Sequence, residues 1–314
     1  MPTAQRLLVA MLGLGLLGPA AGCRPDRERS VRTPSGGVKL AYALKTGTSF
    51  DGHLRIGTTR QVEGMSENLT QSLECDARLF VMAVDEAGSA TVRATFRNVD
   101  LDWSVPPAVG LSSDQFAKLA SEQLRGLELR FTLSPRGKLL AMPSGPERPA
   151  PEIVGLLDTL GLAVTLGFVE LPANAIEPRH TWRDAPADPQ RLAGAPTIDA
   201  TFEGRVRPGK EGPVLAKIMQ SMTSAREVST ASGPRRRQLE AEIVLRLDAD
   251  GVPAQTDSEL RDFDPQRGLA VQEFHSSWTL TDAGNDAATA VQDINDPCDP
   301  DYVGSEQCTA AESP

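Results

Sequence analysis

Few side chains in this sequence are suited to catalysis. The chain has 314 residues, four of them cysteine and three histidine: His53, His180 and His275. The histidines are either a shared acid–base site, with His180 beside Trp182 as its centre, or, more simply, three solvent-facing side chains. The sequence has no Gly-x-Ser-x-Gly, no His-Glu-x-x-His, no phosphate-cradling Gly-x-x-x-x-Gly-Lys-Ser/Thr and no Gly-x-Gly-x-x-Gly that opens a helix. We therefore expect no enzymatic activity and no cofactor.

Two charged runs are candidates for ion binding. Asp248-Ala249-Asp250-Gly251 resembles the start of a calcium loop, but the later ligand spacing is missing, so a hairpin turn explains it better. The cysteines and histidines lack metal-ligand spacing, and no metal site is predicted. Arg235-Arg236-Arg237 is a cationic run in an acidic chain. It is either a solvated loop or a contact for anionic lipid headgroups or a partner.

The N-terminal residues have the pattern of an export signal. Residues 1–6 carry one cation, Arg6, and residues 7–17 are apolar apart from two glycines. This run is too short to span a bilayer, which needs about 20 apolar residues. It ends in Gly18-Pro19-Ala20-Ala21-Gly22-Cys23. The ending resembles the lipobox of bacterial lipoproteins, with Ala20 in the position where the lipobox usually has Leu.

The lipobox resemblance implies a signal peptide of residues 1–22 and acyl chains on Cys23. Two or more acyl chains anchor a protein stably to a membrane. In the sorting rule of enteric bacteria, Asp after the cysteine retains a lipoprotein in the inner membrane. Because Arg24 occupies this position, we expect a cell-envelope protein of the outer membrane. An ordinary secretory signal with an incidental cysteine is the alternative.

Composition divides the rest of the chain into three parts. The formal net charge of −10 at pH 7 argues against nucleic acid as a partner. Residues 23–37 combine the predicted lipidated cysteine with a stretch rich in Pro, Gly, Ser and charges, which predicts a flexible tether. Residues 283–314 contain seven carboxylates and no Lys or Arg, which predicts a disordered acidic tail. Residues 38–282 are predicted to form one globular domain.

The remaining three cysteines are compatible with one disulfide. An exported compartment permits disulfides, and Cys298 and Cys308 lie close together in the predicted tail, which makes them the natural pair. Cys75 would then be a free thiol in a strand, in the role of a small buried apolar residue. Pairing of Cys75 with a tail cysteine stays open.

The dominant hydrophobic period of the domain is two. Apolar and polar residues alternate over residues 38–44, 127–133, 198–206 and 239–247, as in antiparallel strands with one face on a core. Turn-forming residues at 85–88, 134–137 and 248–251 separate such strands. A short strand is expected near Trp182. The sequence predicts an α+β fold with a mostly antiparallel, curved sheet backed by two or three helices.

Three segments have helical spacing. Ser113 or Asp114 is the candidate cap of a helix that runs to about Arg125. A second helix is predicted over about residues 151–167, and a third over about 213–225. Because a helix followed by a hairpin occurs in both halves of the domain, we expect an internal duplication, although no residue-level repeat accompanies it.

Short motifs resemble those of a family of bacterial exported lipoproteins with a domain of unknown function. They are Gly47 followed by Phe50, the hairpin over residues 131–140, and Leu171-Pro172 leading to Trp182. The resemblance covers about residues 38–282. It implies fold and location but no chemistry, and at the level of architecture it extends to the curved half-barrels of periplasmic lipid carriers.

The sequence supports two functional hypotheses. In the first, the protein is a membrane-anchored binding module for a lipid or other hydrophobic ligand, enclosed between the sheet and the second helix. Its candidate ligand-binding residues are Leu156, Leu157, Leu160, Val164 and Phe168, and simple core packing is the alternative reading of the same residues. In the second, the protein is a structural or assembly lipoprotein that contacts another envelope protein through sheet edges or the acidic tail.

Overall fold

The computed structural model describes residues 28–61, 68–104, 112–150, 153–184, 197–230 and 233–285. Cys23, Cys298 and Cys308 lie outside these residues. The predictions of a signal peptide, of lipidation at Cys23, of the tail disulfide and of disorder after residue 285 therefore fall outside the described residues.

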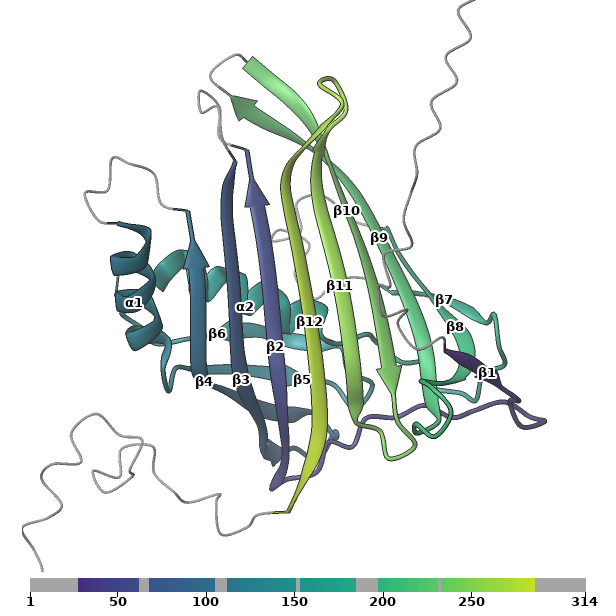
Figure 1. Cartoon of the computed structure of the whole chain (residues 1–314). Helices are drawn as coiled ribbons and strands as arrows, with labels where there is room; N and C mark the ends of the chain where they lie inside the picture. Colours follow the sequence, from purple (N-terminus) through teal and green to yellow (C-terminus); the bar gives the residue numbers. More distant parts are fainter. Residues whose placement is uncertain are drawn as a thin grey trace, which may run out of the picture.

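One antiparallel sheet of 12 strands makes up most of the fold (Figure 1). Along the sheet the order is β1-β8-β9-β10-β11-β12-β2-β3-β4-β5-β6, and β7 pairs with β8 off this path. The strands are β1 Arg29–Val31, β2 Thr48–Arg60, β3 Leu69–Val84, β4 Ala90–Trp103, β5 Glu128–Leu133, β6 Leu139–Ser144, β7 Thr181–Asp184, β8 Thr197–Arg207, β9 Leu215–Thr230, β10 Gly233–Leu247, β11 Pro253–Asp264 and β12 Leu269–Asn285. The sheet is open and curved, and the class is mainly β, so the predicted α+β class is only approximate.

The sheet has one apolar face and one polar face. On β2, Leu54 and Ile56 are buried while Arg55 between them is exposed, and the other long strands alternate in the same way. Both helices, α1 Ser113–Leu124 and α2 Val154–Leu166, pack on the buried face, which we call the inner face. The fold therefore has two layers, with α2 crossing behind the long central strands in Figure 1.

The two helices were predicted, and their ends follow from local chemistry. Ser112 is the N-cap of α1: its hydroxyl accepts from the amide of Gln115, whose side chain accepts from the amide of Ser112. This capping box moves the cap one residue before the predicted candidates. In α1, Phe116 packs edge-on against Trp103 of β4, with ring centroids 4.7 Å apart. Helix α2 begins after Ile153, which makes no side-chain cap hydrogen bond.

The prediction of a third helix over residues 213–225 is wrong. This segment belongs to β9, which pairs with β8 on one side and β10 on the other. Leu215, Ile218, Met219 and Met222 have helical spacing, but Ile218, Gln220 and Met222 also share the inner face of a strand. The two periods are hard to separate in a short apolar segment, and pairing along both edges decides for the strand. Without this helix the parallel between the two halves is lost, and the internal duplication is not shown.

The prediction of a strand over residues 38–44 is also wrong. The segment makes one isolated bridge, Val38 to Ile176, and a main-chain hydrogen bond from Ala43 to Gly251. Its alternation has a different cause, because Leu40 and Tyr42 are buried against the core while the residues between them are not. The segment crosses one end of the sheet without entering it.

Strand β1 lies inside the segment predicted to be a tether. It pairs with β8, and Glu28 just before it forms ion pairs with Lys217 of β9 at 2.9 Å and Arg246 of β10 at 2.5 Å. At the other end, β12 continues to Asn285, past the predicted domain boundary at Asp282. The predicted strands over 127–133, 198–206 and 239–247, the strand near Trp182 and the three turns are confirmed.

Candidate functional site

The predicted ligand-binding residues of α2 point into the protein core. Leu156, Leu160 and Val164 are at most 1% exposed, whereas Leu157 and Phe168 are half-buried at the edge of the same cluster. Only one residue of α2 has a charged side chain, Asp158. The helix thus presents apolar side chains around most of its circumference, more than a helix that faces solvent on one side would carry.

A buried tyrosine fastens the segment that follows α2. Tyr42 donates to the carbonyl of Val169 at 2.9 Å, and its hydroxyl accepts from the amide of the same residue at 3.1 Å. Burial raises the pKa of the Tyr42 phenol far above its usual range, against a smaller opposing effect of the hydrogen bond with Val169. Phe168 packs against the rings of Tyr42 and Phe131, both with centroids 5.8 Å away.

The space beside Phe168 is too small for a ligand. An apolar void there, between Tyr42, Phe50 and Phe168, has a volume of about 10 Å³. A void of this size holds at most about one water molecule. Because Leu156, Leu160 and Val164 are themselves packed into the core, a ligand between sheet and helix would have to take the place of part of the helix.

The sheet side of this interface contains polar atoms that the sequence interpretation missed. Thr256 of β11 donates to the carbonyl of Gly167 at the end of α2 (3.2 Å), and Ser258 and Ser276 share a hydrogen bond of 2.6 Å. The indole nitrogen of Trp278 lies next to Gly167 and is buried without a hydrogen-bond partner among the described residues. An indole N–H normally finds a partner when buried. The apolar–polar alternation along β11 and β12 could have predicted that Thr256, Ser258, Ser276 and Trp278 face the core.

Cys75 lies on the inner face and is free and buried, as predicted. Burial, and secondarily the negative charges of Asp76 and Glu74, raise the pKa of the Cys75 thiol to about 12. A thiol with this pKa is almost wholly protonated at neutral pH and is a poor nucleophile. Cys75 therefore contributes packing to the core.

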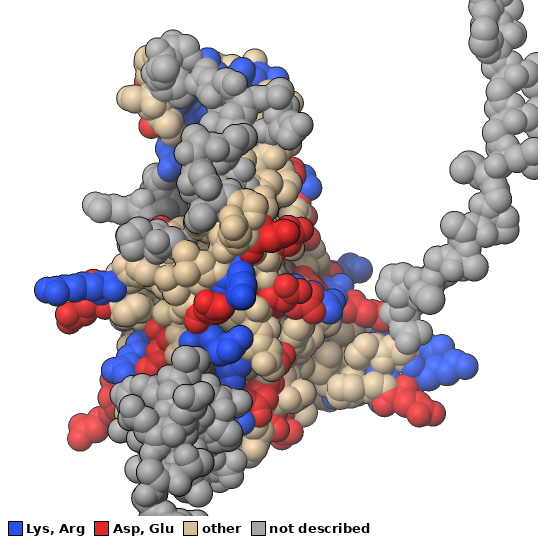
Figure 2. All heavy atoms as spheres, turned by 60° about the vertical axis from the view of Figure 1, so that its left-hand side comes forward, with Lys and Arg blue, Asp and Glu red and all other residues tan. Residues whose placement is uncertain are grey.

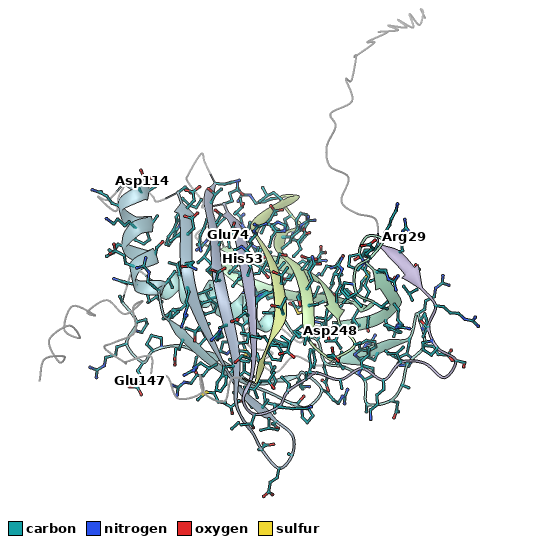
Figure 3. All side chains as sticks on the ribbon, turned by 60° about the horizontal axis from the view of Figure 1, so that its bottom comes forward. Arg29, His53, Glu74, Asp114, Glu147 and Asp248 are labelled. Carbon is teal, nitrogen blue, oxygen red and sulfur yellow. The ribbon has the colours of Figure 1, made fainter. Side chains whose placement is uncertain are left out.

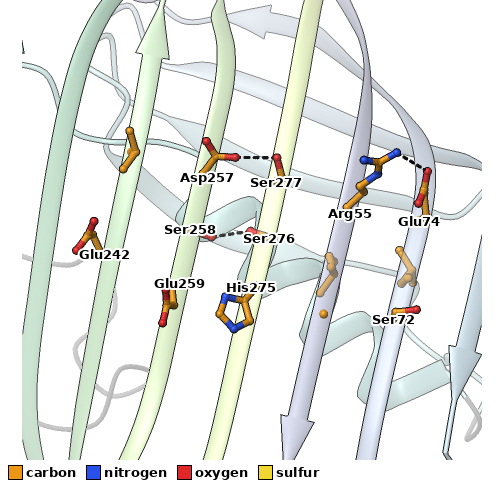
Figure 4. Close-up of a pocket in the computed structure, with 14 residues that line it drawn as sticks. Arg55, Ser72, Glu74, Glu242, Asp257, Ser258, Glu259, His275, Ser276 and Ser277 are labelled. Atoms are coloured by element: carbon orange, nitrogen blue, oxygen red, sulfur yellow. Dashed lines mark hydrogen bonds and ion pairs between the residues drawn. The ribbon is translucent and has the colours of Figure 1, made fainter. Parts of the chain in front are cut away.

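On the opposite, outer face a shallow groove crosses β10, β11, β12, β2 and β3 (Figure 4). Its volume is about 530 Å³. The main chain of Ser258 and Ser276 lies along its floor. The outward-facing side chains of the residues before and after them on the strands form its walls. Asp257 accepts from Ser277 at 2.8 Å, and Arg55 pairs with Glu74 at 3.0 Å, so these wall residues already pair with each other. We interpret the groove as a solvated polar sheet face.

The histidines do not form one site. His53 and His275 lie on the outer face of β2 and β12, whereas His180 precedes β7 at the far side of the sheet and stacks on Trp182. His53 lies between two carboxylates, with Nε2 2.8 Å from Glu74 and Nδ1 3.1 Å from Asp76. Figure 3 labels His53 and Glu74, which lie on the neighbouring strands β2 and β3. His180 and His275 are exposed. The simpler interpretation of separate, largely solvent-facing histidines is therefore confirmed for these two.

The partners of His53 are exposed carboxylates with lowered pKa values. Hydrogen bonds from Arg55 and then His53 lower the pKa of Glu74, and those with Asn98 and then His53 lower the pKa of Asp76. Both carboxylates are thus paired at the sheet surface. The arrangement forms a polar network across β2, β3 and β4, and its members Arg55 and Glu74 also line the outer-face groove.

The acidic turn and the arginine run have defined places. Asp248 Oδ1 accepts from the amides of Asp250 at 2.9 Å and Val252 at 2.8 Å, which confirms the hairpin turn. Arg235, Arg236 and Arg237 belong to strand β10, not to a loop.

Acidic and basic side chains are interspersed on the side of the molecule that carries α1 and β4 (Figure 2). Within the described ranges, no helix has the length and apolar character to cross a membrane.

Comparison with known proteins gives limited information. The sequence matches no protein-family model and no curated protein. Among solved structures, a structure of lipid–protein interactions in lipovitellin is 13% identical, with a TM-score of 0.47. The match covers 77% of this chain and 25% of the lipovitellin chain.

Two further structures are similar over most of their length but with low scores. DynF from the dynemicin biosynthesis pathway of Micromonospora chersina has a TM-score of 0.20 at 8% identity, over 82% of this chain and 91% of that one. A DUF1329 family protein from Desulfovibrio piger has a TM-score of 0.15 at 9% identity, over 77% and 88% of the two chains. Because all three TM-scores lie below 0.5, membership of the predicted lipoprotein family stays a prediction.

Proposed function

We propose that this protein binds a hydrophobic ligand on the inner face of its sheet, in the place that α2 occupies here, as a lipoprotein anchored through Cys23 to the outer membrane. The observation that carries the proposal is α2 itself. It is an almost wholly apolar helix that packs on the curved sheet and takes no part in the hydrogen-bonded pairing of the strands. Its buried side chains make non-directional contacts, which another apolar body can replace.

The attachment of α2 supports its role as a displaceable cover. Its N-cap, Ile153, offers no side-chain hydrogen bond, and the last turn has no basic residue. The N-terminal half of such a helix loses mainly apolar contacts when it moves, whereas the C-terminal end gives up the hydrogen bond from Thr256 to Gly167 unless it acts as the hinge. Displacement would also uncover Trp278, whose buried N–H lacks a partner among the described residues, to a ligand with a polar atom.

The alternative function, assembly with another envelope protein through a sheet edge, has weaker support. The edge strand β6 contains Pro143 and shows two irregularities in its pairing with β5. Both features discourage the addition of another strand. Leu140 on β6 is 52% exposed, but a single exposed leucine is ordinary for a protein surface.

The proposal is tested with the chain carrying Cys23→Ser, which removes the acceptor for a covalent acyl chain. Oleyl alcohol is titrated while the fluorescence of Trp278 is followed in a background of Trp103→Phe and Trp182→Phe. Saturable binding with a change in emission is expected, because Trp278 lies against the end of α2. Native mass spectrometry of the same sample gives the stoichiometry.

Two variants of α2 separate a cover from ordinary core. Leu160→Ala removes buried contacts and should lower the stability by about 2–5 kcal/mol. If α2 competes with the ligand, this variant also binds oleyl alcohol more tightly, because the open form is more populated. Val154→Ala, at a position 46% exposed on the same helix, is the control and should change neither quantity. Absence of binding in the parent and in Leu160→Ala would refute the proposed function.

A further inference from the structure

Five charged residues gather on the inner face near the end of the β9–β10 hairpin at the top of Figure 1. Leu239 and Ala241 of β10 are buried on the inner face, and by alternation Arg237 and Arg235 follow on the same side. Arg226 lies directly opposite Arg237 on β9. The cluster consists of Arg226, Arg235, Arg237, Asp262 and Asp264, and we call it the arginine cluster.

Two of the three arginines in the cluster are paired with its aspartates. Arg226 Nη2 lies 3.2 Å from Asp262 Oδ2, and Arg235 Nη1 lies 3.5 Å from Asp264 Oδ2. Asp264 has no exposed side-chain area, and its Oδ1 also accepts from the amides of Gln266 and Arg267. One oxygen of each carboxylate thus accepts hydrogen bonds, whereas Asp264 Oδ2 accepts none among the described residues.

Arg237 differs from its neighbours. Its Nε and Nη1 atoms are buried and have no hydrogen-bond acceptor among the described residues. A buried guanidinium N–H without an acceptor is costly, and such a group calls for a ligand or water. Asp262 Oδ1 is buried without a partner as well.

The cluster keeps a positive balance. Burial alone would raise the pKa of Asp264, but the amides of Arg267 and Gln266 and the charges of Arg237 and Arg235 lower it overall. The cluster itself contains three guanidinium groups and two carboxylates. The excess of one positive charge lies on the inner face.

An apolar strip joins this cluster to the region under α2. Leu245 pairs with Thr256, which pairs with Trp278, so Leu245 marks the region under α2. Between Arg237 and Leu245 the buried side chains of the inner face are mostly apolar. They are Met222, Leu239, Ala241, Ile243, Leu260 and Phe274. Arg237 and Leu245 are eight residues apart on one strand, or about 26 Å. A long acyl chain can span this distance.

We propose that the ligand of the inner face is an amphiphile with an anionic headgroup, which accepts hydrogen bonds from Arg237 while its acyl chain lies on the apolar strip. This inference rests on the proposed function and names its ligand class. The planar fork of a guanidinium matches the paired oxygens of a carboxylate or phosphate. An apolar strip that ends at a guanidinium group favours a ligand that combines an acyl chain with an anionic headgroup.

The test compares oleate with oleyl alcohol, which share one tail and differ in the headgroup. Binding is measured by titration calorimetry with the chain carrying Cys23→Ser, and inorganic phosphate serves as a headgroup without a tail. We expect oleate to bind at least about 10-fold more tightly than the alcohol, the equivalent of about 1.4 kcal/mol. Phosphate alone should bind far more weakly than oleate.

Matched variants locate the preference. Arg237→Gln should abolish the preference for oleate, and Arg237→Lys should retain only part of it, because lysine keeps the charge but not the fork. Arg236→Gln removes the same charge from the exposed, outer face of the same strand and should leave the preference unchanged. Thermal unfolding verifies that the variants fold.

Each outcome has a distinct meaning. Equal binding of oleate and the alcohol, or a preference that survives Arg237→Gln in a folded protein, would overturn the anionic headgroup while the proposed function stands. Binding of phosphate as tight as oleate would show a free anion as the ligand and overturn the amphiphile. Absence of binding by either oleyl compound would overturn the proposed function itself.

Discussion

At the scale of residues, Gly137 lies in close contact with the ring of Tyr42 beside the segment that follows α2. Gly137, in the β5–β6 turn, has a φ of +86°, and a Cβ built on it would overlap the ring of Tyr42. Tyr42 in turn holds Val169 after α2 through its hydroxyl. The turn, the loop over residues 38–44 and the end of the helix therefore depend on one another.

We predict that Gly137→Ala lowers the free energy of unfolding by more than about 2 kcal/mol, since it combines an unfavourable φ with displacement of the Tyr42 ring. Urea denaturation measures the change. Gly57→Ala is the control: no atom lies within 4 Å of its Cβ position, so it should be neutral or slightly stabilising. Similar losses in both variants would show that the contact with Tyr42 is not responsible.

At the scale of elements, Glu28 adds ion pairs to the attachment of β1, which is otherwise paired with β8. Glu28 is 26% exposed and pairs with Lys217 and Arg246. Burial by itself raises the pKa of Glu28, but the hydrogen bonds and charges of Lys217 and Arg246 outweigh it, so the pKa is below its usual value of 4.5. A lowered pKa stabilises the folded state above the unfolded-state pKa, and this contribution disappears as the pH falls through the folded-state pKa.

Glu28→Gln should therefore cost about 1 kcal/mol at pH 7 and progressively less as the pH falls below about 4.5. Urea unfolding of the parent and the variant at pH 7 and pH 3 measures the difference, and the comparison cancels the other carboxylates. A difference that stays constant between these pH values would mean that the charge of Glu28 does not hold β1.

The same scale shows what a sequence can and cannot predict here. The helices α1 and α2 and strands β5, β8 and β10 were predictable because their apolar residues follow one period. Strand β9 was mistaken for a helix because polar Gln220 and Ser224 occupy inward positions and hide its alternation. In the candidate site, the apolar side chains of α2 were predictable from the sequence. The roles of Trp278 and Arg237 were not, because they depend on which strands pair beside them.

At the scale of the whole molecule, the fold limits the distance between the domain and its proposed anchor. Only four residues lie between Cys23 and Glu28, which makes five steps from one Cα atom to the next. Five such steps span at most about 18 Å. Under the proposed lipidation, the end of β9 and β10 next to Lys217 and Arg246 stays close to the membrane, because residues 29–31 of the predicted tether pair with β8. The arginine cluster, about 30 Å away along β10, would face away from that membrane.

This orientation predicts unequal distances from the bilayer. The acylated protein on vesicles with a headgroup dye is labelled at Asp250→Cys, in the turn near Arg246, or at Gln266→Cys, in the hairpin at the opposite end. Energy transfer should be markedly stronger from Asp250, because about 30 Å of strand separates the two ends. A flexible Gly-Ser linker inserted before Glu28 should reduce the difference. Equal transfer from both positions without the linker would mean that the sheet lies flat or moves freely. The arginine cluster would then have no fixed orientation relative to the membrane.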